Sequence, residues 1–348
     1  MLNLISFLIV IAICVISHEG GHFAAAKWRN VLVHEFSFGM GPNLFRKKIG
    51  ETSWSLRAFP IGGFVKLEGE DETETELRPE NYDPLRSLGH KKPWERLIII
   101  AAGAAVNLLL AWLLTAAYLS GYGVYDLNRP VIGTIIQRTP AQKSSLLPGD
   151  LIISINGIKL HKWEDISNNI RNTRNKNGDF VIVYKRNGKQ NTTSLNIPID
   201  KEYKVRLLGI RPRLTTYPIY KSLSESFSYS WQASLAILKA LVTLITGKVH
   251  TEITGPVGIA VMAGDAFRSG FWAFIGFLGI INLNLGLLNL LPFPALDGGR
   301  IFFILIEMLT KHKVPEKWEA YIHYCGFIIL VMLIVYVTGK DIMHLMQH

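Results

Sequence analysis

Apolar residues gather in four long runs along the chain, separated by polar stretches. The runs cover residues 2–26, 97–119, 271–291 and 321–337. Each comes close to the roughly 20 apolar residues that an α-helix needs to cross the hydrocarbon core of a bilayer. The pattern therefore predicts a polytopic α-helical membrane protein with four transmembrane segments.

The charges beside these runs predict the orientation of the chain. No basic residue precedes the first run, whereas Lys27 and Arg29 follow it directly. Because Lys and Arg concentrate in short cytoplasmic loops, we expect the N-terminus outside the cytosol and residue 27 onward inside. The run continues past any signal-peptide cleavage site, so we expect it to be retained. Alternation then places residues 120–270 outside and residues 300–317 inside.

Short β-strands are predicted between the first two runs. Residues 34–38 and 53–66 are rich in aromatic and β-forming side chains and are interrupted by glycines and prolines. We interpret the acidic stretch 68–80 as a solvated loop, and the basic residues 91–93 lead into the second run.

A compact α/β module is predicted over residues 130–212. A short helix is expected to open at Thr139, a longer one to cover residues 163–174, and a turn to lie at Asn187 and Gly188. Strands are predicted at residues 131–136, 151–156, 180–185 and 192–197. About 85 residues suffice to close one small core.

The stretch after this module alternates aromatic, polar and aliphatic positions. Residues 218–247 therefore predict an amphipathic helix that lies in the membrane interface. These patterns divide the chain into four parts. They are a membrane core at 1–120, the α/β domain at 127–213, a linker at 214–270 and a second part of the membrane core at 271–348.

Composition supports a membrane protein and limits its partners. The chain is 49% apolar and carries a formal net charge of +10. Residues 127–213 hold sixteen Lys and Arg against six Asp and Glu, which accounts for the whole excess. On a module outside the cytosol we expect no nucleic acid, and favour anionic lipid headgroups or an acidic partner. The only cysteines, Cys14 and Cys325, lie in apolar runs, so we expect packing residues and no disulfide.

The clearest chemical signal lies near the end of the first run. His18, Glu19 and His22 form an H-E-x-x-H pattern. A spacing of four residues puts both imidazoles on one helix face, where they can grip one zinc ion, and puts Glu19 close enough to activate water. In a soluble protein the same pattern is often two surface histidines.

The membrane setting favours the metal site. An unpaired charge near the bilayer centre costs on the order of 3 kcal/mol or more. The ionisable groups of this motif therefore need partners, and zinc supplies one. The glycines between the histidines, Gly20 and Gly21, would let another backbone come close.

A third ligand is expected because catalytic zinc usually has three protein ligands and one open position. Asp297 is a carboxylate inside the apolar stretch 274–309, which at ~1.5 Å per residue is too long for one membrane-spanning helix. Its prolines and glycines must break the helix, and a broken helix in a membrane faces protein or a water-filled cavity. The alternative is that Asp297 caps a helix at Gly298.

Three amides precede this break. Asn289 could hydrogen-bond a substrate carbonyl or a developing oxyanion. For Asn282 and Asn284 hydrogen bonds between helices are the favoured interpretation.

Several motifs in the same order resemble the site-2 proteases of the bacterial RseP type, the zinc metalloproteases of regulated intramembrane proteolysis. Residues 18–22 match the family's HExxH, and residues 289–299 its Asn-x-x-Pro-x-Pro-x-Leu-Asp-Gly element. Further segments also resemble the family, at residues 38–42, 60–66, 92–96 and 254–260. The resemblance covers nearly the whole chain.

This resemblance implies a metalloendopeptidase with one zinc ion per chain. It implies His18, His22 and Asp297 as zinc ligands and Glu19 as the general base. It also implies single-pass membrane proteins as substrates, of the anti-sigma factor type or remnant signal peptides, cut in the bacterial cytoplasmic (inner) membrane with the active site towards the cytosol.

Substrate-binding residues are implied in the same way. They are Asn289, Pro292 and Pro294 beside the third ligand, and Gly62 and Gly63 in a membrane-associated β-element. An exposed edge of that element could accept an unwound substrate as an extra strand.

The module at 130–212 resembles a circularly permuted PDZ domain, in an extracytoplasmic position. Its peptide-binding groove would be formed by a strand at Leu207, Leu208, Gly209 and Ile210. Such a domain could read a peptide C-terminus, filter substrates by size, or be structural. Some members of the family carry two such modules, whereas one copy is visible in this sequence. A second departure is the Gly-Ala at residues 103–104, where relatives often have Gly-Pro, although Asn107 fits.

Two other classes of function remain open from the residues alone. A non-catalytic membrane adaptor would use zinc structurally and require four protein ligands. His34 and His323 are available for that purpose but lie outside the motifs. A zinc transporter would show ionisable groups along a path, whereas here they cluster.

Overall fold

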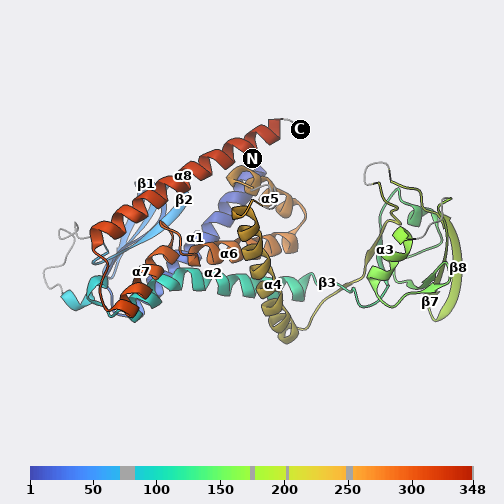
Figure 1. Ribbon diagram of the computed structural model, residues 1–348, viewed down its shortest axis with the longest axis horizontal. Helices are drawn as coiled ribbons and strands as arrows, with labels where there is room; N and C mark the ends of the chain where they lie inside the picture. The colour runs from blue at the N-terminus through green and yellow to red at the C-terminus, as the bar shows by residue number, and fades with distance from the viewer. Residues whose placement is uncertain (71–82, 173–176, 201–203, 248–253, 347–348) are drawn as a thin grey trace. The chain divides into compact units, whose positions relative to one another are not determined.

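The computed structural model describes residues 1–70, 83–172, 177–200, 204–247 and 254–346. The chain divides into two compact units (Figure 1). One comprises Met1–Tyr118 with Ile219–His348, and the other comprises Leu119–Pro218. Each unit is described by itself.

The first unit contains the membrane-spanning helices. Among the described residues four helices are long and apolar enough to cross a bilayer, which confirms the expected spans. They are α1 (Leu2–Trp28), α2 (Pro93–Gly121), α6 (Phe271–Leu290) and α8 (Glu316–Met346). α8 is longer than the apolar run at 321–337, because its helix continues into polar residues at both ends.

Three further helices complete the first unit. They are α4 (Ile219–Ile245), α5 (Pro256–Arg268) and α7 (Asp297–Thr310). The helix expected at 218–247 is thus present as α4. Both α4 and α5, which lie within the expected linker at 214–270, belong to the first compact unit, where α4 packs on α6 and α5 packs on α1.

A small apolar core joins α1, α5 and α6. Val10, Cys14, Ala263 and Leu278 are buried together in it. Cys14 is therefore a packing residue, as expected. Cys325 on α8 is exposed, so its predicted packing role is wrong, and both cysteines are free thiols.

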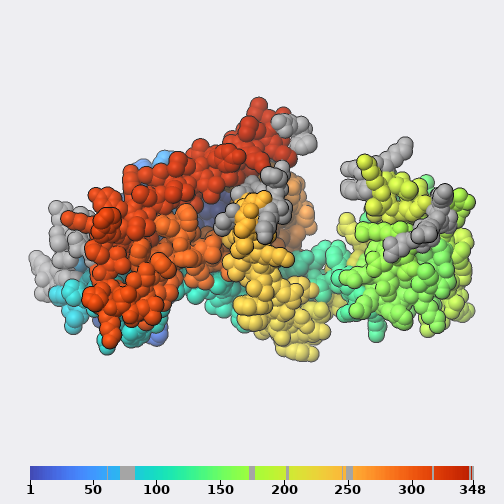
Figure 2. Space-filling model, viewed as in Figure 1, coloured from blue at the N-terminus to red at the C-terminus, as the bar shows by residue number. Residues whose placement is uncertain are grey.

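The C-terminal part of α8 is hydrogen-bonded to the N-terminus of α5. The Asp341 carboxylate accepts hydrogen bonds from the backbone N–H groups of Gly255 (3.1 Å) and Gly258 (2.8 Å). A carboxylate at this position satisfies otherwise unpaired N–H groups and interacts favourably with the helix dipole. In Figure 1, α8 (red) crosses the unit diagonally and its last turns lie near α5. Figure 2 shows α8 on the surface of the unit.

The β-element consists of β1 (Val33–Ile49) and β2 (Thr52–Leu67), which are longer than the strands expected at 34–38 and 53–66. Gly39 and Gly41 have positive φ angles of 87° and 86°, so they bend β1 instead of ending it. As a result residues 35–38 pair on one side with residues 63–66 and on the other with residues 53–56.

Four rows of chain therefore lie side by side, in the order 43–49, 52–57, 33–40 and 63–67. Among the described residues, the row 63–67 has no strand on its outer side. This row packs next to α1, because a Cβ added to Gly63 would meet the side chains of Val15 and Glu19. The β-element thus presents a free edge beside the H-E-x-x-H motif.

Aromatic packing and one buried carboxylate stabilise this sheet. The Phe36 and Trp54 rings stack with their centroids 4.8 Å apart. Glu35 accepts hydrogen bonds from Ser55 (2.5 Å) and Arg57 (2.7 Å). Burial raises the pKa of Glu35, but these hydrogen bonds outweigh burial and leave the pKa below its usual value. Two 3₁₀ turns, Pro84–Arg86 and Leu88–His90, then lead to α2.

The second unit is the expected α/β module. Its main sheet has the order β6-β5-β7-β8, and β4 pairs with β9 and β3 with β10. The helix α3 (Trp163–Asn172) and a 3₁₀ turn (Pro140–Lys143) cover a core that includes Phe180, Ile152 and Ile182. The strands are β3 (Val124–Tyr125), β4 (Ile132–Ile135), β5 (Leu151–Ile155), β6 (Ile158–Lys159), β7 (Asp179–Arg186), β8 (Lys189–Asn196), β9 (Ile210–Pro212) and β10 (Leu214–Thr215). Residues 173–174 of the expected helix lie outside the described residues.

The expected groove strand at residues 207–210 is largely wrong. Only Ile210 lies in a strand, β9. Gly209 has a φ of 83°, which turns the chain, and Leu208 is buried in the core. The Leu208 carbonyl accepts a hydrogen bond from the Ala141 N–H (3.0 Å).

The Asp341 cap generates a prediction for stability. Asp341→Ala leaves the α5 N–H groups without their acceptor, and we expect a loss of about 1–2 kcal/mol, typical of a removed helix cap. The lowered melting temperature should be visible in detergent by circular dichroism. Asp265→Ala is the matched control, because Asp265 is exposed and pairs only with Arg268 on its own helix. An equal loss in both variants would contradict the role of the cap.

Candidate metal centre

Two histidines on one face of α1 meet a carboxylate from α7. The Nε2 atoms of His18 and His22 lie 3.3 Å apart. Asp297 Oδ2 lies 3.1 Å from the first and 3.3 Å from the second. The structure thus brings together the three residues that the sequence singled out as ligands. Within the described part of the chain, no other three His, Cys, Asp or Glu side chains lie close enough together to bind one metal ion.

The hydrogen bonds around His22 determine where its proton lies. Its Nδ1 is 2.9 Å from the Ile99 carbonyl oxygen, which can only accept, so Nδ1 carries the proton. In the neutral ring Nε2 then presents a lone pair towards Asp297 Oδ2. That oxygen is buried, and no donor among the described residues makes a hydrogen bond to it. Electron-rich atoms at this distance repel one another unless a cation lies between them.

The spacing of the three atoms fits zinc. Zn–N and Zn–O bonds of about 2.0–2.1 Å in a tetrahedral site place neighbouring ligand atoms about 3.3 Å apart. The observed separations of 3.1–3.3 Å match that edge length. Two imidazoles and one carboxylate also form a ligand set typical of catalytic zinc, with a fourth position left open.

The break between α6 and α7 brings Asp297 to the histidines. α6 ends at Leu290 and α7 begins at Asp297, as the length of the apolar stretch predicted. The N-cap of α7 is Leu296, so the alternative of a capping Asp297 is wrong. A Cβ on Gly298 would collide with the Leu291 carbonyl group, which shows how tightly the connecting segment folds back on the helix.

Close contact between α1 and α2 positions His22. A Cβ added to Gly21 would collide with the Ala102 backbone of α2, and one added to Gly103 would overlap the His22 ring. Gly103 thereby lets the imidazole reach the Ile99 carbonyl one turn earlier. Of the two glycines in the motif, only Gly21 serves a close approach, because a Cβ on Gly20 would meet nothing within 4 Å.

The ligands line a cavity of about 530 Å³ together with Glu19. Gly63 and Phe64 from the free β-edge form part of its wall, opposite residues 295–297. α8 contributes Tyr324 and Phe327. The wall of this cavity therefore contains the three ligand residues, the Glu19 carboxylate and the outer row of the β-element at Gly63 and Phe64.

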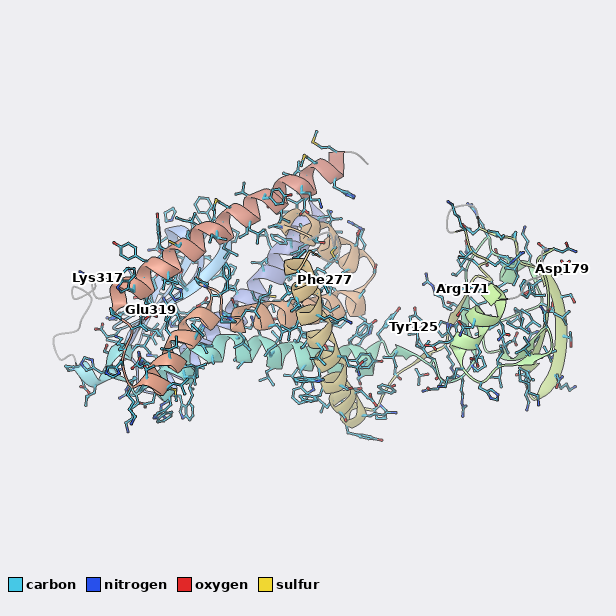
Figure 3. The ribbon with its side chains drawn as sticks, viewed as in Figure 1. Tyr125, Arg171, Asp179, Phe277, Lys317 and Glu319 are labelled. Carbon is cyan, nitrogen blue, oxygen red and sulfur yellow. The ribbon has the colours of Figure 1, made fainter. Side chains whose placement is uncertain are left out.

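A second cavity of about 380 Å³ adjoins the first and shares Arg300 and His323 with it. Its wall is rich in charge, including the Arg96–Glu307 pair (2.5 Å) and the Arg300–Glu70 pair. Lys317 and Glu319 at the start of α8 also line it, and Figure 3 shows both at that end of the helix. A wall with this many charged side chains is typical of a water-accessible space.

The remaining predicted substrate residues are placed differently. Gly63 lines the cavity, whereas Gly62, with a φ of 80°, packs against Met40. Asn289 is buried at the end of α6, and neither it nor Pro292 or Pro294 lines the cavity. Pro294 instead packs on Gly326 of α8. Leu207, Leu208, Gly209 and Ile210 belong to the other unit.

The two histidines outside the motifs have other partners. His34 lies 2.7 Å from Glu68. His323 Nδ1 accepts a hydrogen bond from the Ala295 N–H (3.0 Å). Neither belongs to the metal-capable group, which has three members within the described residues.

Sequence reasoning missed several residues of the cavity wall. Phe64, Tyr324 and Phe327 are aromatic residues among many others, and nothing in their spacing marks them. Arg300 could have been found from the sequence, because it places a charge in an apolar stretch three residues after Asp297. That charge was used only to predict the membrane orientation of the chain.

The whole chain is similar to a known family. The profile of Peptidase family M50 matches residues 6–333. The chain belongs to that family. This confirms the resemblance to site-2 proteases.

Individual relatives of this family M50 peptidase agree. A protein of Clostridium acetobutylicum named as a candidate zinc metalloprotease is 35% identical over 98% of both chains. Zinc metalloprotease RasP of Geobacillus kaustophilus is 30% identical over 98% of this chain and 97% of its own. Regulator of sigma-W protease RasP of Bacillus subtilis is 28% identical over 99% of both.

One solved structure also matches part of the chain. The PDZ domain of an SdrC-like protein from Listeria monocytogenes is 27% identical, with a TM-score of 0.20, over 25% of this chain and 87% of its own. A TM-score this low leaves the PDZ resemblance a prediction.

These findings establish the class of protein. The chain is a zinc metalloendopeptidase of the site-2 type, and its apolar helices make it a multi-pass protein of the bacterial inner membrane.

The contact between α1 and α2 predicts that substitutions of the adjacent Gly20 and Gly21 have different effects on stability. Gly21→Ala forces α1 away from the Ala102 backbone, and we expect a loss of about 1–3 kcal/mol, as for other overpacked interfaces. Gly20→Ala should be neutral or stabilising by up to about 1 kcal/mol, because Ala favours a helix and the space is open. Thermal unfolding in detergent measures both. Equal stability of the two variants would contradict this packing.

Proposed function

We propose that this peptidase hydrolyses peptide bonds within the transmembrane segments of single-pass membrane proteins. The three zinc ligands and the general base would act from the wall of one cavity. The observation that carries the proposal is the meeting of His18, His22 and Asp297 with Glu19 beside a free strand edge, inside a membrane unit. A structural zinc in an adaptor would need a fourth protein ligand, and the described residues offer none in the group.

His18, His22 and Asp297 hold one zinc ion per chain in this proposal. When bound, zinc polarises the scissile carbonyl and makes water acidic enough to be deprotonated near neutral pH. Glu19 takes a proton from the attacking water and later gives one to the leaving amine nitrogen. The imidazole of His22 keeps its orientation throughout, because its Nδ1–H remains bonded to the Ile99 carbonyl.

The free edge of β2 holds the substrate in an extended form. A helix hides its peptide bonds from attack, so a transmembrane substrate must unwind locally. Main-chain hydrogen bonds to residues 63–67 would replace those lost on unwinding, as in other cases of strand addition. Gly63 lies next to Glu19, which brings the added strand to the catalytic carboxylate. Gly62 shapes this edge, and Asn289, Pro292 and Pro294 support the segment that carries Asp297.

Position in the bilayer indicates where cleavage occurs. His22 lies about 9 Å before the end of α1 at ~1.5 Å per residue, so the site is nearer to the end that carries Lys27 and Arg29. Cationic flanks face the cytosol. We therefore place the active site towards the cytosolic side, and the second, charged cavity on the route by which water reaches it.

The substrates proposed are anti-sigma factors or remnant signal peptides. Support for the first comes from a relative whose name describes it as a regulator of sigma-W. The second unit, outside the cytosol and strongly basic, would act as a PDZ-like module that reads a peptide C-terminus or excludes large substrates. Within the described residues, β9 pairs with β4 alone, which leaves its other edge for a peptide.

Replacement of Glu19 tests the chemistry. Glu19→Gln removes the base but keeps the shape of the site, so cleavage of a single-pass test substrate should fall at least 100-fold, within the range expected for a lost general base. Zinc content, measured by atomic absorption, should stay near that of the wild type. The substrates to compare in detergent are a remnant signal peptide and a single-pass protein with a cytosolic domain. Undiminished cleavage by the variant, or by protein stripped with a chelator, would refute the mechanism.

Thiol labelling tests the orientation. In a variant lacking Cys14 and Cys325, a single cysteine at Lys189→Cys in the second unit should react with an impermeant maleimide in intact spheroplasts. A cysteine at Lys47→Cys in the β-element should react only after lysis. Both positions are exposed, so accessibility depends on the side of the membrane. The reverse pattern would overturn the proposed topology.

A further inference from the structure

A chain of buried polar side chains leads away from His18. Asn107 on α2 is fully buried, and its amide nitrogen lies 3.4 Å from His18 Nδ1. Its amide oxygen lies 2.7 Å from Ser17 Oγ on α1. Asn282 on α6, also fully buried, lies on the far side of Ser17, with its amide oxygen 3.5 Å from Oγ. A buried amide in an apolar membrane helix is costly unless it is fully hydrogen-bonded.

If the Asn107 amide oxygen faces Ser17, the hydrogen-bond donors in this series of side chains do not match the acceptors. The Ser17 hydroxyl has one proton but faces three oxygens, those of Asn107, Asn282 and the Cys14 carbonyl (2.9 Å). At the other end, an amide nitrogen beside His18 Nδ1 requires that nitrogen to be an acceptor. The proton of a neutral imidazole would then sit on Nε2, where it would block a metal ion.

A half-turn of the Asn107 amide removes the conflict at His18 and takes one of the three oxygens away from the Ser17 hydroxyl. The oxygen and nitrogen exchange places without moving their neighbours. The Asn107 nitrogen then donates to Ser17 Oγ, and the single hydroxyl proton goes to the Cys14 carbonyl. His18 Nδ1–H donates to the Asn107 oxygen, and Nε2 is left with a lone pair towards His22 Nε2 and Asp297 Oδ2. The Asn107 oxygen then faces a donor at His18, and the Asn107 nitrogen faces an acceptor at Ser17.

We propose that Asn107 is the positioning residue for His18, accepting a hydrogen bond from His18 Nδ1 and thereby keeping Nε2 free to bind zinc. It does for His18 what the Ile99 carbonyl does for His22. Both partners come from α2, so this helix sets the proton positions of the two imidazoles of α1. The inference rests on the proposed zinc site and adds a residue to it.

Zinc affinity in detergent tests the inference, measured by competition with a chromophoric chelator and independently of proteolysis. Asn107→Leu removes the acceptor at similar volume, and zinc should bind about 10- to 100-fold more weakly, as for other lost partners of metal-bound histidines. Asn107→Asp keeps an acceptor for Nδ1–H, so its affinity should stay within a few-fold of the wild type. The cobalt-substituted protein should show a tetrahedral visible spectrum for wild type and Asn107→Asp, and an altered one for Asn107→Leu.

Asn282→Leu is the matched control, because it removes a buried amide from the same chain without touching His18. It should lose stability but retain wild-type zinc affinity. If Asn107→Leu binds zinc as tightly as the wild type, or if Asn107→Asp loses as much affinity as Asn107→Leu, the positioning role is refuted. Should Asn107→Leu fail to fold, Asn107→Ala, which also removes the acceptor, takes its place in the comparison with Asn107→Asp. Failure of the wild type to bind zinc would instead refute the proposed metal site.

Discussion

The structure depends on the convergence of three electron-rich atoms inside an apolar unit. His18 Nε2, His22 Nε2 and Asp297 Oδ2 lie 3.1–3.3 Å from one another, and the described residues offer Asp297 Oδ2 no hydrogen-bond donor. In a membrane such a cluster is unfavourable unless a cation occupies its centre. The surrounding features follow from that constraint: glycines that let α1 approach α2, a broken helix that delivers the carboxylate, and backbone and amide acceptors that fix the protons of the imidazoles.

A protease in a membrane must also supply water and an unwound substrate. In the proposed mechanism both requirements are met at the same cavity. The charged second cavity adjoins it, and the free edge of β2 forms its wall next to Glu19. The bends at Gly39 and Gly41 matter here, because they fold two long strands into four rows and thereby leave residues 63–67 at an edge. In that proposal, the β-element unwinds the substrate directly beside the catalytic carboxylate.

Local pattern was enough for the spans, for the motif and for the family. Four apolar runs were predicted, and four helices of spanning length are found in the part of the chain that the structure describes, because the bilayer imposes a length on each. The break before Asp297 followed from the same length argument. The β-element was predicted only roughly, since glycines that usually end strands here bend them. The helix α4 was expected, but its packing on α6 and the packing of α5 on α1 are tertiary contacts that the sequence pattern did not indicate.

By itself, the sequence determined the membrane class, two histidines on one helix face, and a carboxylate that had to find a partner. These follow from helical spacing and from the cost of charge in hydrocarbon, which act locally. Only the tertiary structure decided that Gly21 and not Gly20 meets α2, that Pro292 and Pro294 stand away from the cavity, and that Ile99 and Asn107 face the imidazoles. Such contacts depend on how separate helices cross, and no pattern along one helix records the atoms that its neighbour presents.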